Sequence, residues 1–313
     1  MKFSIDINTN EIFPVITLKN EEEKASVEVY TFGALLNNFT INDSINIIDG
    51  FVSPQDAKTN ITKGFKSAKL SPFVCRMADG KYAFNDHEYK IDKFYLNKEA
   101  IHGLLFNELF SVADQDADDN NASVILEYNY TKQNEGFPFL YSCVITYTLE
   151  TNNRLSIKTT IINNSNTAMP LSDGWHPYFS LGAKVDELSF QMNSEKLVEF
   201  TGKLVPTGKI IAYDNFQQPE IIGDTFLDNC FLLNENNAAA CILRDDKSGL
   251  ELSIWPDAAY PYLQVYTPPH RNSIAIENLS STPDAFNNKM GLIILNVGEK
   301  AHFKTTYQAA IKS

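Results

Sequence analysis

The stretch Leu155–Ile162, LSIKTTII, decides the fold class of this chain. Side chains at every second position of an extended strand fall on one face. One face here carries Leu155, Ile157, Thr159 and Ile161. The other face carries Ser156, Lys158 and Thr160. This alternation predicts a strand with one side toward a core and one wetter side, as in a half-buried antiparallel sheet.

Segments of the same kind recur along most of the chain, and clusters of Asn, Asp, Gly and Pro separate them. They are ASVEVYTF, SVILEYNY, SCVITYTL, LSIWP, YLQVYT, SIAIEN, GLIILNV and HFKTTYQ. Sustained apolar stripes with a period of 3.6 residues are rare, and no alternation of strands with helices suggests a TIM barrel or a Rossmann fold. The sequence therefore predicts an all-β protein with minor, short helices.

The domain organisation follows from length and composition. Hydrophobic residues make up 43% of the 313 residues and charged residues 21%, which is typical of globular proteins with a sizeable core. All-β sandwiches often exceed 200 residues as one unit. Because no Pro/Gly/Ser-rich linker and no repeat of constant period divides the chain, we expect a single domain over residues 1–313.

The charge balance limits the classes of partner. The formal net charge is -13, and the whole chain has four arginines, at Arg76, Arg154, Arg244 and Arg271. Binding to phosphate backbones depends on clustered Lys and Arg, so nucleic acid and anionic membranes are excluded as expected partners. The scarcity of arginine also argues mildly against a substrate with several phosphates.

The expected compartment is the cytoplasm. The amino terminus, MKFSIDINTNEIFPVITLKNEEEK, contains acidic residues and has no apolar core of signal-peptide length. No later segment reaches the apolar length of a membrane helix. The cysteines form no C-x-x-C pair and are expected to be buried free thiols; they are Cys75, Cys143, Cys230 and Cys241.

Local metal motifs are missing from the sequence. The five histidines contain no i,i+2 or i,i+4 pair and no neighbouring cysteine at zinc spacing, which leaves open only a site assembled from distant strands. The run DQDADDNN begins like a calcium loop, but Asp119 replaces the required Gly and Ile125 the required Glu. We interpret it as a solvated turn between strands, and we predict no metal and no cofactor.

Three segments each place a titratable residue among Gly, Pro, Asn and aromatic residues, where strands are expected to end and loops to begin. They are NKEAIHGLLFNELF around His102, LSDGWHPYFSLG around His176, and SIAIENLSSTPDAFNN around Glu277. Taken alone, a histidine is usually a hydrogen-bonded structural residue, and a glutamate that ends a strand is usually exposed. The combination of the three carries more information than any one of them.

Together these segments resemble the aldose 1-epimerase (galactose mutarotase) family in order and spacing: an HG segment, an HPYF-type segment, then IAIE followed by PDAFNN. VYTFGALLNNFTI, CRMADGKYAF and LDNCFLL are similar to further family stretches, so the resemblance covers nearly the whole chain. It implies a large twisted antiparallel β-sandwich, the galactose mutarotase-like supersandwich, with a small-molecule sugar in an open cleft on one sheet. Whether the protein is a monomer or a homodimer stays open.

The resemblance also implies roles for individual residues in interconverting sugar anomers. Glu277 would be the base that takes the proton from the C1 hydroxyl, and His176 the acid that protonates the ring oxygen, with His102 close by. Arg76 and Asp228 match positions that bind sugar hydroxyls. An aromatic ring packs well on the C–H face of a sugar, and Trp175, Tyr178 and Phe179 are the neighbouring aromatic residues. Of these, Trp175 is the predicted sugar-binding residue, and Phe179 fits the core equally well. Trp175 stands where many family members have Asn, which leaves the preferred sugar open.

Three other functions compete with this interpretation. A hexose-6-phosphate 1-epimerase is expected to have arginines after the HG segment, but Leu104, Leu105 and Phe106 follow Gly103. A non-catalytic carbohydrate-binding module would not require an acid and a base together. A glycoside hydrolase needs two carboxyl groups about 5 to 9.5 Å apart. Asp228 and Glu277 could supply them, but the two histidines would then have no explanation.

Overall fold

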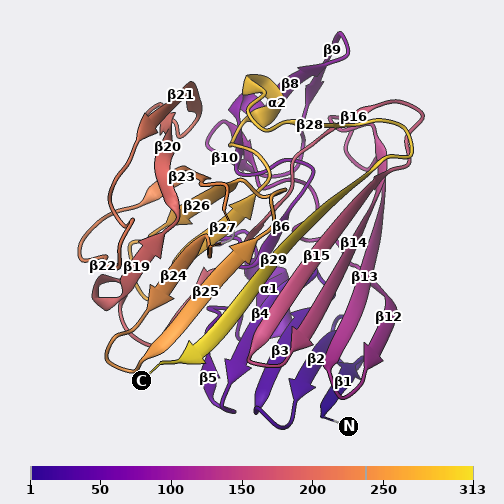
Figure 1. The fold of residues 1–313 in the computed structure, drawn as a ribbon. Helices are drawn as coiled ribbons and strands as arrows, with labels where there is room; N and C mark the ends of the chain where they lie inside the picture. The colour runs from indigo at the N-terminus through magenta and orange to yellow at the C-terminus, as the bar shows by residue number, and fades with distance from the viewer. Residues whose placement is uncertain (1, 237, 313) are drawn as a thin grey trace.

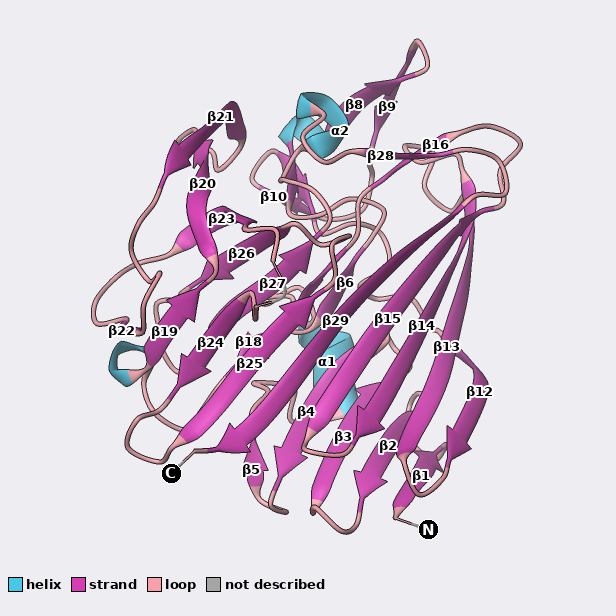
Figure 2. Cartoon of the chain, viewed as in Figure 1, coloured by secondary structure: helices cyan, strands magenta, loops and turns pink. Residues whose placement is uncertain are grey.

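The computed structural model describes residues 2–236 and 238–312, and most of its regular structure is β-strand (Figures 1 and 2). Two short α-helices occur in the described residues, α1 (Pro54–Asn60) and α2 (Ala285–Asn288), with single 3₁₀ turns at Ala78–Gly80 and Val185–Glu187. Helix α1 begins where Ser53 caps it, because the Ser53 Oγ accepts a hydrogen bond from the Asp56 N–H at 3.1 Å. The expectation of an all-β chain with minor helix is confirmed.

The largest sheet has nine antiparallel strands. In spatial order they are β12 (Ser111–Ala117), β13 (Asn121–Thr131), β14 (Leu140–Glu150), β15 (Arg154–Asn163), β29 (Lys300–Ile311), β25 (Leu250–Pro256), β24 (Cys241–Arg244), β19 (Ser189–Met192) and β22 (Glu220–Ile221). The LSIKTTII stretch lies in β15, with its four expected core positions buried and Lys158 exposed. Ser156, expected on the wetter side, is buried, and its hydroxyl lies 3.4 Å from the hydroxyl of Thr306 in β29. The predicted alternation is otherwise confirmed.

A second antiparallel sheet has eight strands and carries most of the predicted site. Its order is β21 (Pro206–Ala212), β20 (Ser194–Phe200), β23 (Asp228–Leu233), β26 (Tyr262–Tyr266), β27 (Ile274–Leu279), β17 (Gly174–His176) and β6 (Ala68–Leu70), with β18 (Tyr178–Phe179) also paired to β27. In Figure 1 this sheet lies beside the upper part of β25 and β29. It places the residues of three distant segments, near positions 70, 176 and 277, on adjacent strands.

The amino-terminal strands form a five-stranded antiparallel sheet: β1 (Phe3–Asn8), β2 (Val15–Asn20), β3 (Ala25–Tyr30), β4 (Leu35–Ile41) and β5 (Ile45–Asn46). Three small sheets complete the described residues. They pair β10 (Tyr95–Leu96) with β11 (Glu99–Ile101) and β7 (Arg76–Met77), β8 (Lys81–Phe84) with β9 (His87–Lys90), and β16 (Met169–Leu171) with β28 (Ile293–Leu295). The β8–β9 hairpin projects at the top of Figure 1.

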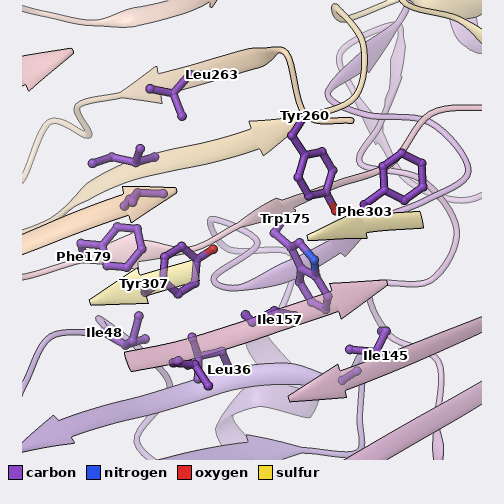
Figure 3. Close-up of a cluster of buried hydrophobic side chains, with 14 of the residues drawn as sticks. Leu36, Ile48, Ile145, Ile157, Trp175, Phe179, Tyr260, Leu263, Phe303 and Tyr307 are labelled. Atoms are coloured by element: carbon purple, nitrogen blue, oxygen red, sulfur yellow. The ribbon is translucent and has the colours of Figure 1, made fainter. Parts of the chain in front are cut away.

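The core lies between the sheets. One cluster of buried apolar side chains draws on all three large sheets, and Figure 3 shows part of it. Leu36 comes from β4, Ile157 from β15 and Leu263 from β26, so each sheet buries one face against the others. The large antiparallel sandwich is thus confirmed, whereas the single domain over residues 1–313 stays a prediction.

Two smaller expectations can be compared with the structure. All four cysteines are buried and free, as predicted. The acidic run forms a turn between β12 and β13, in which the Asp118 Oδ1 accepts hydrogen bonds from the backbone N–H groups of Asn120 and Asn121.

None of the helices in the described residues has the length and apolar composition needed to cross a bilayer.

Candidate active site

A cavity of about 310 Å³ opens at the eight-stranded sheet, and its wall contains five of the six residues that the sequence singled out. Those five are Arg76, His102, His176, Asp228 and Glu277. The polar part of the wall comes from strands β7, β17, β23, β26 and β27 and from His102, which follows β11. The apolar part is formed mainly by Phe65, Phe94, Leu96, Ile101, Phe200 and Leu204.

Glu277 reaches the cavity floor from within β27. All six residues of that strand are buried, so alternation decides which side chains meet the cavity. The next residue, Asn278, donates a hydrogen bond to the Thr305 hydroxyl of β29 at 2.6 Å and therefore points into the sandwich. Glu277 points the opposite way. We had expected this residue where the strand ends, but β27 continues to Leu279.

His176 is the last residue of β17, which pairs with β27 on one side and with β6 on the other. Its Nε2 lies 3.2 Å from the Glu277 Oε1, and both side chains are almost fully buried. The backbone carbonyl of His176 accepts a hydrogen bond from the Ser67 N–H at 2.8 Å. The strand therefore holds the imidazole directly against the carboxyl group.

His102 is held by an unusual backbone turn. It has a φ of 63°, and the next residue, Gly103, has a φ of 75°. A Cβ atom at Gly103 would lie 2.4 Å from the Ser71 carbonyl oxygen, so only glycine fits there. The turn places the His102 ring edge-to-face with His176, with ring centroids 4.8 Å apart, and 4.5 Å from the Phe65 centroid. The HG motif is explained by this close approach.

The three titratable groups have strongly perturbed pKa values. Burial raises the pKa of Glu277 well above its usual value, and the nearby Asp228 charge adds to this. Burial lowers the pKa of His176 to about 4. The pKa of His102 is lowered well below its usual value by burial first, and then by His176 and Arg76. These shifts favour a neutral Glu277–His176 pair, in which one proton lies between the two groups.

No neighbouring side chain among the described residues binds the Nδ1 atom of either imidazole. The Nδ1 atoms of His102 and His176 are buried and have no hydrogen-bond partner among the described residues. A histidine whose Nδ1 is bound to a carboxylate or carbonyl is locked in one tautomer.

Asp228, Arg76 and Gln264 form a polar group next to Glu277. Asp228 begins β23, and its Oδ1 accepts a hydrogen bond from the Gln264 Nε2 at 2.9 Å. Burial raises the pKa of Asp228, while the charge of Arg76 acts in the opposite direction. Gln264 stands opposite Glu277 in the β26–β27 register, and its Oε1 has no partner within the described residues.

Sequence reasoning missed Gln264. The available signal was a single amide in the apolar strand segment YLQVYT, where a buried polar side chain requires a partner. The strand pattern alone could not show that this partner would be Asp228, which lies 36 positions away in the chain.

Trp175 is the one predicted site residue that the structure does not bring to the cavity. It precedes His176 in β17 and therefore points to the opposite face. Its ring centroid lies 6.1 Å from that of Tyr147, and the Lys69 Nζ lies 4.4 Å from the Trp175 ring. Figure 3 shows it among core side chains. Tyr178 does line the cavity, whereas Phe179 packs on Tyr307 in the core.

The charged side chains and possible metal ligands of the cavity limit the ligands that it can bind. Among the residues described around it, Arg76 is the only Arg or Lys, and its charge acts on the carboxyl group of Asp228. In the described part of the chain, no group of three or more His, Cys, Asp or Glu side chains is arranged to hold a metal ion. The described lining of the cavity offers hydrogen-bonding and proton-transfer groups.

Comparison with known proteins shows the family and the fold of this chain. Residues 14–308 match the sequence profile of a family described as aldose 1-epimerase. The chain is 27% identical over 237 residues to the protein YihR of Escherichia coli K12, covering 74% of each chain. Among solved structures, a galactose mutarotase-like protein from Clostridium acetobutylicum has a TM-score of 0.88 at 18% identity, covering 99% of this chain and 98% of that one. The galactose 1-epimerase of Lactobacillus acidophilus has a TM-score of 0.86 at 19% identity, covering 100% of both chains.

Proposed function

This chain belongs to the aldose 1-epimerase family, and from that premise we propose that it interconverts the α and β anomers of a free, uncharged aldohexose such as galactose or glucose. The observation that carries the proposal is the 3.2 Å contact between the His176 Nε2 and the Glu277 Oε1 on the wall of the cavity. It brings a proton acceptor and a proton donor together where a sugar ring can reach both.

The reaction requires two proton transfers on one O–C–O unit. Glu277, as carboxylate, takes the proton from the C1 hydroxyl while protonated His176 gives a proton to the ring oxygen, and the C1–ring oxygen bond breaks to give the open aldehyde. Rotation about C1–C2 and reclosure with the roles reversed gives the other anomer. The neutral pair holds the same number of protons, so moving its proton from Oε1 to Nε2 produces the reactive form.

His102 and the polar group beside Glu277 complete the proposed site. The His102 ring, 4.8 Å from His176, is placed to stabilise charge on the ring-oxygen side. Arg76, Asp228 and Gln264 would bind sugar hydroxyls, and a charged partner strengthens such hydrogen bonds in a partly desolvated cavity. Trp175 is not included, because it faces the core.

A free sugar fits better than a sugar phosphate. A dianionic phosphate is usually bound by several Arg or Lys donors, and Arg76 is the single basic side chain among the described cavity residues. The carboxylate of Asp228 would also repel a phosphate group. We also propose that no cofactor takes part, because each positioned proton transfer contributes about 10²- to 10⁴-fold to the rate.

The proposal is tested by following anomer equilibration of freshly dissolved α-galactose and α-glucose by polarimetry or by NMR of the anomeric proton. The wild-type protein should accelerate equilibration over buffer, and Glu277→Gln should lose at least about 100-fold of that acceleration. Glu88→Gln, at an exposed carboxyl of the β8–β9 hairpin, is the matched control and should behave as wild type.

The other outcomes separate the alternatives. Acceleration with glucose 6-phosphate but with neither free sugar would replace the proposal by a phosphosugar epimerase. Binding of galactose or glucose without any acceleration would indicate a carbohydrate-binding module. Full activity of Glu277→Gln would exclude Glu277 as the base.

A further inference from the structure

Cys75 occupies an unusual position in the candidate active site. It is the one cysteine among the described residues that line the cavity, and it precedes Arg76 at the start of β7. Its Sγ lies 3.9 Å from the Glu277 Oε2, and its backbone carbonyl accepts a hydrogen bond from the His102 N–H at 2.8 Å. The residue thus contacts the proposed base through its side chain and holds the backbone of His102.

The contact with Oε2 matters because the carboxyl group of Glu277 has few partners. Among the described residues, His176 contacts Oε1 and Cys75 contacts Oε2, and neither oxygen accepts a hydrogen bond from a backbone N–H. A buried carboxylate is normally satisfied by several donors, so the loss of one is expected to have a measurable effect.

We propose that Cys75 is a positioning residue for the base: its S–H donates to the Glu277 Oε2 and thereby directs Oε1 toward His176 and the sugar. The inference rests on the proposed function and extends it to a residue outside the acid–base pair. The same residue fixes His102 through the backbone, so one short segment aligns both sides of the reaction centre.

The surroundings of the thiol support a donor role over a nucleophilic one. Burial raises the pKa of Cys75 well above its usual value, and the neighbouring Glu277 charge adds to the shift, while Arg76 opposes it weakly. The proton therefore stays on sulfur. An S–H group is a weak donor, but here it faces a group that carries negative charge in the reactive form.

Other groups also face Glu277 and must be separated from Cys75 in any pH experiment. His176 of β17, Asp228 and Cys230 of β23, and Tyr178 of β18 all lie close enough to interact with its charge. Of these, Cys230 offers a matched control. It is a fully buried thiol that interacts with the same carboxyl group without a hydrogen bond to it.

The variants Cys75→Ala, Cys75→Ser and Cys230→Ala distinguish a donor from a packing contact. The pKa of Glu277 is measured by NMR of ¹³C-labelled glutamate, with Glu277→Gln identifying the signal, so this readout does not depend on turnover. Cys75→Ala should raise the pKa of Glu277 by about half a unit to one unit, because the donor that favours the ionised form is removed. Cys75→Ser should restore most of the difference, and Cys230→Ala should leave this pKa unchanged.

Mutarotation kinetics of the same variants give the second readout. Cys75→Ala should lower kcat by about tenfold with a smaller change in KM, and should move the acidic limb of the pH profile upward. The inference would be overturned if the Glu277 pKa in Cys75→Ala equals that in the wild type. It would also be overturned if Cys75→Ser has the same Glu277 pKa and kcat as Cys75→Ala. If the wild type does not accelerate mutarotation at all, the proposed function fails, while the NMR titration still decides the role of Cys75.

Discussion

Two buried acid–base pairs, Lys69–Asp173 and His176–Glu277, lie on opposite sides of the sheet around β6 and β17, and their partners differ. On the core side, the Lys69 Nζ contacts the Asp173 Oδ1 at 2.5 Å, the Thr159 hydroxyl at 3.2 Å and the Gly174 carbonyl at 3.3 Å. All three N–H bonds of the ammonium group are therefore used. On the cavity side, the contacts of the pair within the described residues are His176 Nε2 to Glu277 Oε1 at 3.2 Å and Cys75 Sγ to Glu277 Oε2 at 3.9 Å.

The difference in partners indicates a structural role for the Lys69–Asp173 pair and a chemical role for the His176–Glu277 pair. Asp173 also accepts a hydrogen bond from the Tyr260 hydroxyl at 2.7 Å, so the core pair is held by several neighbours at once. A buried polar network of this kind holds strands in register and leaves no room for a ligand. The His176–Glu277 pair has fewer contacts among the described residues and lies on the wall of a cavity, where a ligand can approach it.

The largest expected effect comes from breaking the core pair. Lys69→Met should lower the free energy of unfolding by about 3–5 kcal/mol, because Asp173 would be left buried without its cation. Urea unfolding followed by circular dichroism measures the change. Adding Asp173→Asn should recover part of the loss, since no charge remains buried and the amide oxygen can still accept from Tyr260. A loss below about 1 kcal/mol in the single variant would contradict the comparison.

Replacing Glu277 should raise the free energy of unfolding, whereas replacing Lys69 should lower it. Its pKa is raised in the folded protein, so the folded state binds the proton more tightly than the unfolded state, and stability decreases as pH rises above the ordinary value of 4.5. Glu277→Gln removes this dependence and should be more stable than wild type, by a margin that grows with pH at no more than about 1.4 kcal/mol per unit. Thermal or urea unfolding of both proteins between about pH 4 and pH 8 measures the difference in their free energies of unfolding. A margin that shrinks with rising pH would show that the carboxylate is stabilised in the fold.

A smaller effect is expected at the edge of the site. Gln264→Leu should raise KM for the sugar by about tenfold with little change in kcat, because a hydroxyl partner and the donor to Asp228 are lost while the acid–base pair remains. Initial rates of mutarotation over a range of sugar concentrations give both constants. Gln115→Leu, at an exposed position of β12, serves as the control. An unchanged KM would place Gln264 outside the sugar contacts.

The smallest effect on activity is expected for Trp175. Trp175→Phe keeps an aromatic ring next to Lys69 and should change kcat and KM by less than about twofold, with a loss of unfolding free energy of about 1 kcal/mol. Kinetics and urea unfolding of one preparation measure both quantities. A large rise in KM with unchanged stability would mean that Trp175 reaches the sugar after all.

The sequence predicted some parts of this arrangement and not others for identifiable reasons. The two-residue period of LSIKTTII correctly gave the faces of β15, because only one of those faces is buried along most of its length. Strands β17 and β27 are buried on both faces, so their sequences, GWH and IAIENL, carry no such contrast. Trp175 was therefore assigned to the cavity although it faces the core. Glu277 and His176 were found through the family resemblance and not through periodicity.

The sequence by itself determined the all-β class and the buried free cysteines, because these depend on local periodicity and composition. Only the tertiary structure brought Cys75, Gln264 and Glu277 into one cavity and placed Lys69 with Asp173 behind it, since these contacts join strands that are far apart in the chain. The side of a doubly buried strand that faces a ligand is set by which sheet packs on the other side. Which face meets the cavity is therefore decided by the packing of the sheets and cannot be predicted from the sequence of one strand.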